Sequence, residues 1–528
     1  MQSTPVVKTA NRQIAAAAMT IMLAFILSQV FGLVRQILAT RAFGTTPVMD
    51  AFTAAGIYPD LIFSLVASGA LASAFIPSFT GLLTRGDQHS AWRLSSAIIN
   101  LVVVSLAILS VVSILFAPQI VRYILAPKFP PAEAALCAEL LRIRLLAPVI
   151  FGISGLLMGI LNTHQRFLLP ALAPAMNWLG MILGLLLFVP SMGIYGYAWG
   201  AVLGALLHLA IQLPGVARLP NRVYFPTFGL DNPHVRQVGI LMAPRLMGVA
   251  AVQLNFLVNT ILATGQPVGS TTAISVAWML LSVPEVVIAQ AIAIAALPTF
   301  SAQVARAELS EMRLSLSATL RSVVLLSLPA SLGLILLGRP LTVLFFQHGV
   351  FTPHSTDMVV WALFWYAIGL LGHSMVEVTS RAFYAMHDTR TPVITTTLAM
   401  GINIVLSLAF SWLFNQLGWA PHGGLALANS LSTALEGVAL LVLMRSRLNG
   451  LSGRRLLAGL GQAALATAVM SLCVWGWMAV TPAFNPGLIV IVGVLIGGGS
   501  YFLVAWLLKV PELVELIQLV FLRVKPLF

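Results

Sequence analysis

A few ionisable residues near the first long apolar stretch of this chain limit the chemistry available there. Arg35 and Arg41 follow that stretch, and Asp50 opens the second one. The planar guanidinium fork suits bidentate contact with phosphate, so one interpretation of the arginines is the cationic lining of a cavity. The other is a pair of interfacial anchors that extend toward water. Asp50 suits a helix N-terminus and is also placed to pair with either arginine.

Polar amides and one further arginine occur in two of the apolar stretches. Gln29 lies in the first, whereas Gln253 and Asn259 lie in the seventh, with Arg245 about two turns before them. Interhelical hydrogen bonds explain such amides as well as contact with a substrate does. Arg245 either lines a cavity or extends back to the surface.

Glu377 and Arg381 stand four residues apart, the spacing of an intrahelical ion pair. We interpret them as a neutralised structural pair or as part of a coupling site. No P-loop and no H-E-x-x-H motif occurs, and Cys137 and Cys473 are isolated, so the sequence predicts neither an enzyme nor a metal site.

The composition decides the class of protein that must position these residues. Of 528 residues, 59% are hydrophobic and only 8% are charged. A soluble protein carries roughly 25% charged residues, so soluble enzymes, secreted disulfide scaffolds and disordered chains are excluded. The expected fold is an all-α polytopic membrane protein with an uncleaved first helix. The net charge of +13 is expected to reflect cytoplasmic loops rather than nucleic-acid binding.

The apolar pattern predicts about fourteen transmembrane helices. Pro59 and Pro284 lie inside the two longest segments and mark expected kinks. The candidate spans lie near residues 14–36, 50–83, 94–118, 138–162, 168–189, 192–214, 236–263, 271–300, 318–338, 358–386, 392–414, 423–444, 456–480 and 486–508.

Loop charge predicts the orientation of these spans. Most basic residues fall in loops on the side that both termini share, which is therefore expected to be cytoplasmic. Arg35, Arg41, Arg142 and Arg144 are assigned to the opposite side in this topology.

An internal repeat divides the spans into lobes. Residues 29–40 align with 253–264, and residues 118–129 align with 340–351, at offsets of 224 and 222 residues. Such an offset covers six spans, an even number, which predicts two parallel six-helix lobes at 1–222 and 223–450. The segment 451–528 then adds two C-terminal helices. Two lobes of this kind are typical of alternating-access transporters.

Several segments together resemble the MurJ/MviN family, the lipid II flippases of bacterial peptidoglycan synthesis, within the multidrug/oligosaccharidyl-lipid/polysaccharide exporter superfamily. The resemblance covers nearly the whole chain in one register. The segments that carry it are Gly32–Phe52, Gly69–Pro77, Gly159–Pro174, Pro340–Thr352 and Ala382–Pro392.

The resemblance implies a flippase that moves the undecaprenyl-pyrophosphate-linked precursor, lipid II, from the cytoplasmic to the periplasmic leaflet. It implies a cationic cavity for the headgroup, a groove for the polyprenyl tail at 451–528, and residence as a monomer in the bacterial cytoplasmic membrane, with both termini inside. Lipid II or a similar glycolipid and membrane lipids are the expected partners. No cofactor is expected, and transport would be coupled to the membrane potential or to a monovalent ion.

The chain departs from the family pattern at several cavity positions. Gln29 and Gln36 stand where the family carries an arginine and an aspartate, and Ser64 and Met279 stand where it carries further arginines. Whether these losses abolish lipid II transport is left open by the sequence. The alternatives are an exporter of another polyprenyl-linked glycan or lipid, and a scaffold of the cell envelope that transports nothing.

Overall fold

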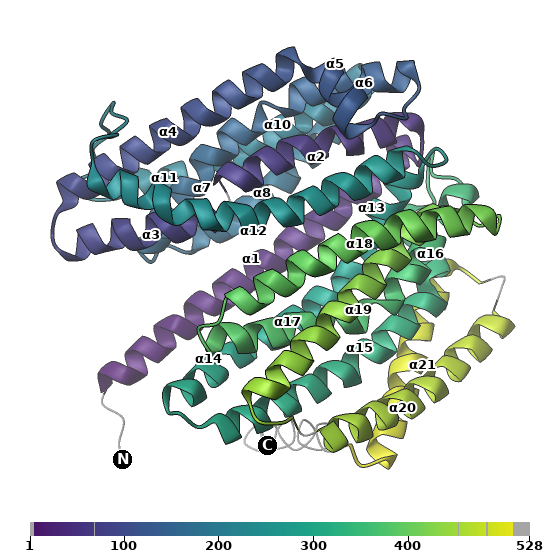
Figure 1. The fold of residues 1–528 in the computed structure, drawn as a ribbon. Coiled ribbons are helices and arrows are strands. Elements are labelled where there is room, and N and C mark those ends of the chain that lie inside the picture. Colours follow the sequence, from purple (N-terminus) through teal and green to yellow (C-terminus); the bar gives the residue numbers. More distant parts are fainter. Residues whose placement is uncertain (1–4, 68, 452, 482–483, 511–528) are drawn as a thin grey trace, which may run out of the picture. The chain divides into compact units, whose positions relative to one another are not determined.

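The computed structural model describes residues 5–510 except 68, 452 and 482–483. The side chains of 5–23, 65–74, 241, 243–249, 251 and 454–456 lie outside the description as well. Every regular element in the described part is a helix (Figure 1), which confirms the predicted all-α class. The chain divides into two compact units, Met1–Val268 and Gly269–Phe528.

The first unit is built from twelve labelled α-helices among its described residues. They are α1 (Pro5–Phe43), α2 (Pro47–Ala67), α3 (Gly69–Thr84), α4 (Gln88–Leu115), α5 (Ala117–Ile120), α6 (Pro131–Arg144), α7 (Ala147–Thr163), α8 (Leu168–Leu183), α9 (Val189–Met192), α10 (Ile194–Ala210), α11 (Leu213–Ala217) and α12 (Pro233–Thr264). Two π-helical turns interrupt them, η1 (Val121–Leu125) and η2 (Gly184–Phe188).

The second unit contains nine labelled α-helices in its described part. They are α13 (Ser270–Pro284), α14 (Ala291–Ala305), α15 (Leu309–Phe346), α16 (Pro353–Ile368), α17 (Leu370–Ala385), α18 (Arg390–Gln416), α19 (His422–Arg447), α20 (Gly453–Val480) and α21 (Pro486–Leu507). The π-helical turn η3 (Glu285–Gln290) joins α13 to α14. This turn begins directly after Pro284, where a kink was expected.

Among the described residues, ten helices are long and apolar enough to cross a membrane, or eleven if the bent pair α16 and α17 is one span. The predicted count of fourteen stays a prediction. The unit boundary follows α12, because α12 packs against α2 and α3. The predicted lobes stay a prediction.

Two span predictions were wrong in their boundaries. Residues 50–83 form the separate helices α2 and α3, and α2 continues through Pro59. The span predicted at 138–162 begins at Pro131 instead, with α6 and α7 forming one candidate span to Thr163. Proline is favoured in the first helical turn because its missing N–H is not needed there. Arg142 and Arg144, which the predicted topology counts on the outer side, lie within this span.

Glycines set the closest helix contact of the first unit. Gly180 and Gly184 on α8 and η2 face Gly200 and Gly204 on α10, and Cβ atoms built at Gly180 or Gly184 would overlap the opposite backbone. Small residues four apart allow this approach between membrane helices. The contact fixes α8 against α10 and so places the side chains that both helices carry nearby.

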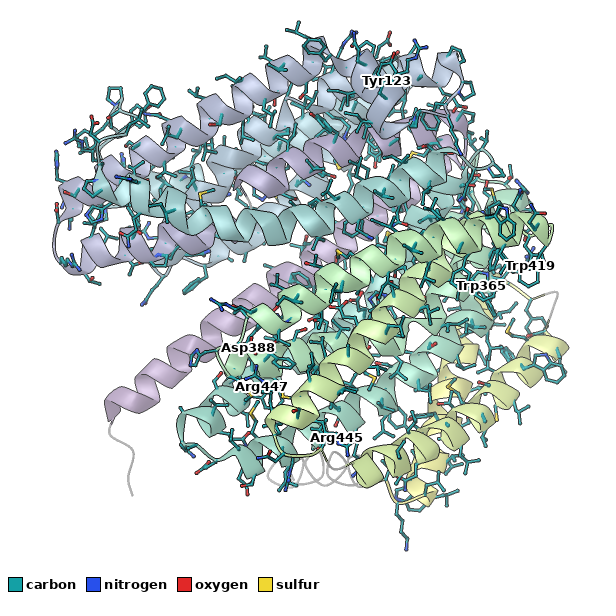
Figure 2. The ribbon with its side chains drawn as sticks, viewed as in Figure 1. Tyr123, Trp365, Asp388, Trp419, Arg445 and Arg447 are labelled. Atoms are coloured by element: carbon teal, nitrogen blue, oxygen red, sulfur yellow. The ribbon has the colours of Figure 1, made fainter. Side chains whose placement is uncertain are left out.

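The two ends of α18 in the second unit differ in chemistry (Figure 2). At its start, Asp388 accepts a hydrogen bond from Arg447 at 3.1 Å, and Arg445 lies on the same turn of α19. At its far end, Trp419 packs edge-on against Trp361 and lies near Trp365, with ring centroids 5.6 and 6.3 Å apart. Aromatic rings mark membrane–water interfaces, and basic clusters mark the cytoplasmic side.

Asp388 caps the start of α18 and links it to α19. Its carboxylate accepts from the Thr391 backbone N–H at 3.0 Å and from the Thr391 hydroxyl at 2.7 Å. The Thr391 N–H holds the pKa of the Asp388 carboxyl below its ordinary value, and the hydroxyl and Arg447 act in the same direction against partial burial.

We expect Asp388→Ala to lower the free energy of unfolding by about 1 kcal/mol, the usual cost of a lost helix cap. Because the folded pKa is depressed, the contribution is present above the ordinary aspartate value of 3.8 and is lost as the pH falls through the lower folded value. Thermal unfolding of the purified protein at pH 7 and pH 3 measures both effects. Asp357→Ala is the matched control, since Asp357 only pairs with the exposed Arg339; an equal loss in both variants would contradict the capping role.

Candidate functional site

Arg35 is the one sequence-predicted cavity arginine that the described structure places in a polar cluster. It lies on α1, two turns before the helix ends at Phe43, so it belongs to the helix and not to the loop after it. One guanidinium N–H donates to the Tyr197 hydroxyl at 2.8 Å and another donates to the Gln36 side-chain oxygen at 2.7 Å. The guanidinium also stacks on the Trp178 ring, 4.8 Å from its centroid. Residues from α1, α8 and α10 thus orient Arg35.

A second arginine, Arg144 at the end of α6, joins this cluster from the other side. It donates to the Phe52 carbonyl at 3.0 Å and stacks over the Phe52 ring at 4.7 Å. Its guanidinium occupies the space where a Cβ of Gly56 would stand. Phe52, Gly56 and Asp60 are spaced four residues apart, so they form one face of α2 along which Arg144 lies.

A stacked aromatic pair joins the two arginines. The Phe52 and Tyr197 rings stack with centroids 4.1 Å apart and planes 17° apart. Arg35 contacts Tyr197, and Arg144 contacts Phe52. Two guanidinium groups therefore flank one aromatic stack inside the first unit.

The cluster contains more hydrogen-bond donors than acceptors. The Arg35 Nε–H and the Gln36 side-chain amide nitrogen are buried without a hydrogen-bond partner in the described structure. The Gln36 side chain is only 3% exposed. Asp60, which is exposed on the same face of α2, attracts Arg144 electrostatically. Buried donors without acceptors and buried charges without partners are costly, so the arrangement favours an anion at this site.

The other predicted cavity residues have separate positions. Arg41 is exposed on α1 and has no hydrogen bond or ion pair in the described part of the chain, and Gln29 is exposed as well. Asp50 lies in the first turn of α2 and is 4% exposed, as a helix N-terminus favours. The roles predicted for these three residues stay predictions.

The predicted polar residues of α12 are only partly described. Asn259 is half-buried and donates to the Asn255 carbonyl and side-chain oxygens, both at 3.1 Å, within the same helix. Gln253 is half-buried, and the side chain of Arg245 lies outside the described residues. Their proposed contact with a substrate stays a prediction.

The second unit holds the predicted ion pair. Arg381 and Glu377 meet at 3.3 Å on α17, which confirms the intrahelical pairing expected from their spacing. The Glu285 carboxylate on η3 repels that of Glu377, and Glu436 on α19 accepts a hydrogen bond from Thr396 at 2.5 Å. In the part of the chain that the structure describes, no three His, Cys, Asp or Glu side chains are arranged to hold a metal ion.

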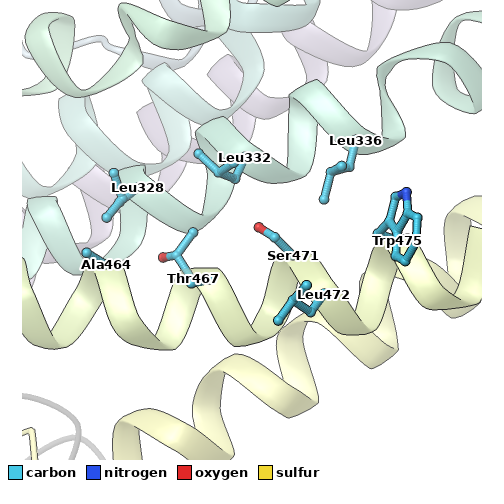
Figure 3. A pocket seen from close by; sticks show the side chains of 9 residues that line it. Leu328, Leu332, Leu336, Ala464, Thr467, Ser471, Leu472 and Trp475 are labelled. Atoms are coloured by element: carbon cyan, nitrogen blue, oxygen red, sulfur yellow. The ribbon is translucent and has the colours of Figure 1, made fainter.

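An apolar groove of about 620 Å³ lies between side chains of the packed helices α15 and α20 in the same unit (Figure 3). Leu328, Leu332 and Leu336 line it from α15, and Trp475 closes one end from α20. The Thr467 and Ser471 hydroxyls also line it. Such a groove suits an extended hydrocarbon chain.

Comparison with known proteins identifies the family. The sequence profile described as "Lipid II flippase MurJ" matches residues 39–495. A lipid II flippase MurJ of Burkholderia cenocepacia is 31% identical over 428 residues, which cover 80% of this chain and 82% of that protein. This chain belongs to the lipid II flippase MurJ family.

Other relatives of this chain are consistent with this assignment. A probable lipid II flippase MurJ of Vibrio cholerae is 28% identical and covers 81% of this chain and 82% of its own length. A solved structure of a lipid II flippase MurJ in an inward closed conformation superposes with a TM-score of 0.80 at 22% identity, covering 92% of this chain and 98% of that one. An inward-facing multidrug transporter of the MATE family has the same fold, with a TM-score of 0.68 at 13% identity over 80% and 94% of the two chains.

Sequence reasoning missed Arg144, Tyr197 and Trp178 as parts of the Arg35 cluster. Arg144 was counted on the outer side and given no role in the site, because the four charged residues of α6 interrupt the apolar pattern before α7. The spacing of Phe52, Gly56 and Asp60 was the available signal for a polar face on α2. Nothing local marks Tyr197 or Trp178, since aromatic residues are ordinary in membrane helices.

Proposed function

We propose that this protein moves lipid II from the cytoplasmic to the periplasmic leaflet by alternating access of its two units. The observation that carries the proposal is the family match over residues 39–495, in a chain whose first unit retains the Arg35 cluster. A diphosphate–sugar headgroup cannot cross hydrocarbon unaided, so the path needs cationic and donor groups inside the membrane. Arg35, Gln36 and Tyr197 supply them.

The apolar groove between α15 and α20 is the proposed site of the polyprenyl tail. Its lining is dominated by leucine and alanine, with Trp475 at one end. A long hydrocarbon chain stays in apolar surroundings in such a groove while the headgroup moves through the polar part of the protein. The protein thereby avoids extracting the whole lipid from the membrane.

The proposed orientation places both termini in the cytoplasm of a bacterium, with the protein in its cytoplasmic membrane. The Asp388–Arg447 end of α18 is then cytoplasmic, since Arg445 and Arg447 cluster there, and the Trp419 end is periplasmic. A monomer is sufficient for this scheme.

Transport is proposed to be coupled to the membrane potential or to a monovalent ion. Three carboxylates within the second unit, Glu285, Glu377 and Glu436, support this part of the proposal, because charges inside a membrane respond to the field across it. No nucleotide-binding motif is present in the sequence to supply another energy source.

Rescue of a bacterium depleted of its own lipid II flippase tests the proposal. We expect cells that express this chain to grow and to expose lipid II at the outer leaflet, measured by labelling from outside. Failure of a well-expressed, membrane-inserted protein to rescue would sink the assignment. Export of another polyprenyl-linked glycan without lipid II would favour a related exporter with a different headgroup.

A further inference from the structure

The side chain of Arg144 lies near the middle of a candidate membrane span. The span runs from Pro131 to Thr163, and Arg144 is the last residue of α6 within it. A charged side chain inside a membrane span costs several kcal/mol unless it faces a partner. The groups around Arg144 therefore indicate its role. In the described structure its side chain donates a hydrogen bond to a backbone carbonyl, that of Phe52.

The surroundings of Arg144 are shaped to hold a guanidinium. The missing side chain of Gly56 leaves the space that the guanidinium fills, and the Phe52 ring lies under its face. Stacking on a ring and bonding to a carbonyl fix the direction of the remaining N–H groups. Arg142, two residues earlier on α6, is exposed and makes a weaker contact to the Ile114 carbonyl at 3.4 Å.

The charge balance around Arg144 leaves room for an anion. Arg35 and Arg144 place two positive charges beside this aromatic stack, and the described hydrogen bonds of their guanidinium groups go to neutral oxygens. The buried, unpartnered donors of Arg35 and Gln36 lie on the other side of the same aromatic stack. An acceptor with several oxygens and more than one negative charge would satisfy both sides.

We propose that Arg144 is a second substrate-binding cation, which binds one phosphate of the polyprenyl diphosphate while Arg35 and Gln36 bind the other. This inference rests on the proposed function. It adds that the protein recognises the diphosphate of the lipid in preference to a monophosphate. Asp60 balances Arg144 when no substrate is bound. The two cations come from separate helices, α1 and α6.

Binding of farnesyl diphosphate and farnesyl monophosphate to the purified protein tests the inference directly. We expect the unaltered protein to prefer the diphosphate about tenfold, because one additional charge-assisted contact is worth roughly that factor. Arg144→Gln should reduce the preference to about one, whereas Arg144→Lys should retain part of it. The matched control Arg142→Gln should keep the full preference.

A purely structural role for Arg144 makes a different prediction. If Arg144 only neutralises Asp60, the double variant Asp60→Asn with Arg144→Gln should recover the diphosphate preference and rescue growth. We expect the double variant to fold, as shown by its melting temperature, and to lack both. Recovery of both, or an unchanged preference in folded Arg144→Gln, would overturn the inference. Failure of the unaltered protein to rescue growth would count against lipid II transport, and the two-ligand comparison would still decide the role of Arg144.

Discussion

Cells that depend on this protein should stop growing when Arg35 is replaced by alanine, although the amount of membrane-inserted protein is unchanged. The substitution removes the donors to Tyr197 and Gln36 and the group that stacks on Trp178. Hydrogen bonds to charged groups contribute about 1.5–3 kcal/mol each. Loss of one such contact to a phosphate would weaken substrate binding roughly 10- to 150-fold.

The conservative substitution separates charge from geometry at Arg35. Lysine keeps the positive charge but cannot form the forked contacts or stack on Trp178 as a guanidinium does. We expect Arg35→Lys to rescue growth partially. Arg122→Ala is the control, since Arg122 also stacks on an aromatic ring, Tyr123, but on the exposed surface. Growth and the melting temperature of purified protein are the measurements, and full activity of Arg35→Ala would show that Arg35 is only an anchor or packing residue.

Arg35 and Arg144 show what the sequence could and could not predict about the site. Arg35 follows a clear apolar stretch, so its position near membrane chemistry was visible from hydropathy alone. Arg144 lies near the start of the predicted span 138–162, where charged residues interrupt the apolar pattern, and its contact with Phe52 on α2 is visible only in the folded structure. Segment boundaries depend on a sum over neighbours, so a few charges can hide the true start of a helix.

Pairings between distant helices were the other limit of prediction. The Glu377–Arg381 pair was predicted because both residues lie one turn apart on the same helix. The contact between Arg35 and Tyr197 joins residues 162 positions apart, and no local pattern encodes it. It depends on how closely α8 and α10 pack, which the glycines of those helices determine.

Of these substitutions, Gly180→Val should lower the free energy of unfolding the most. A Cβ at Gly180 would overlap the backbone of Gly204, and backbone atoms cannot rotate away as side chains do. Overpacking of this kind costs roughly 3 kcal/mol. Helices α8 and α10 would separate, and both Trp178 and Tyr197 would move away from Arg35.

The loss of stability should increase with the size of the side chain added at position 180. A small side chain should therefore reduce transport while most of the protein still folds. Gly180→Ala should retain more folded protein than Gly180→Val but still lose transport, because small shifts of α10 break the contact of Tyr197 with Arg35. Gly239→Val is the control, since Gly239 lies on α12 of the same unit with open space around it. Melting temperature and growth rescue measure the two properties. Equal stability of Gly180→Val and Gly239→Val would contradict close packing of α8 on α10, and with it the physical basis for the placement of Tyr197 beside Arg35.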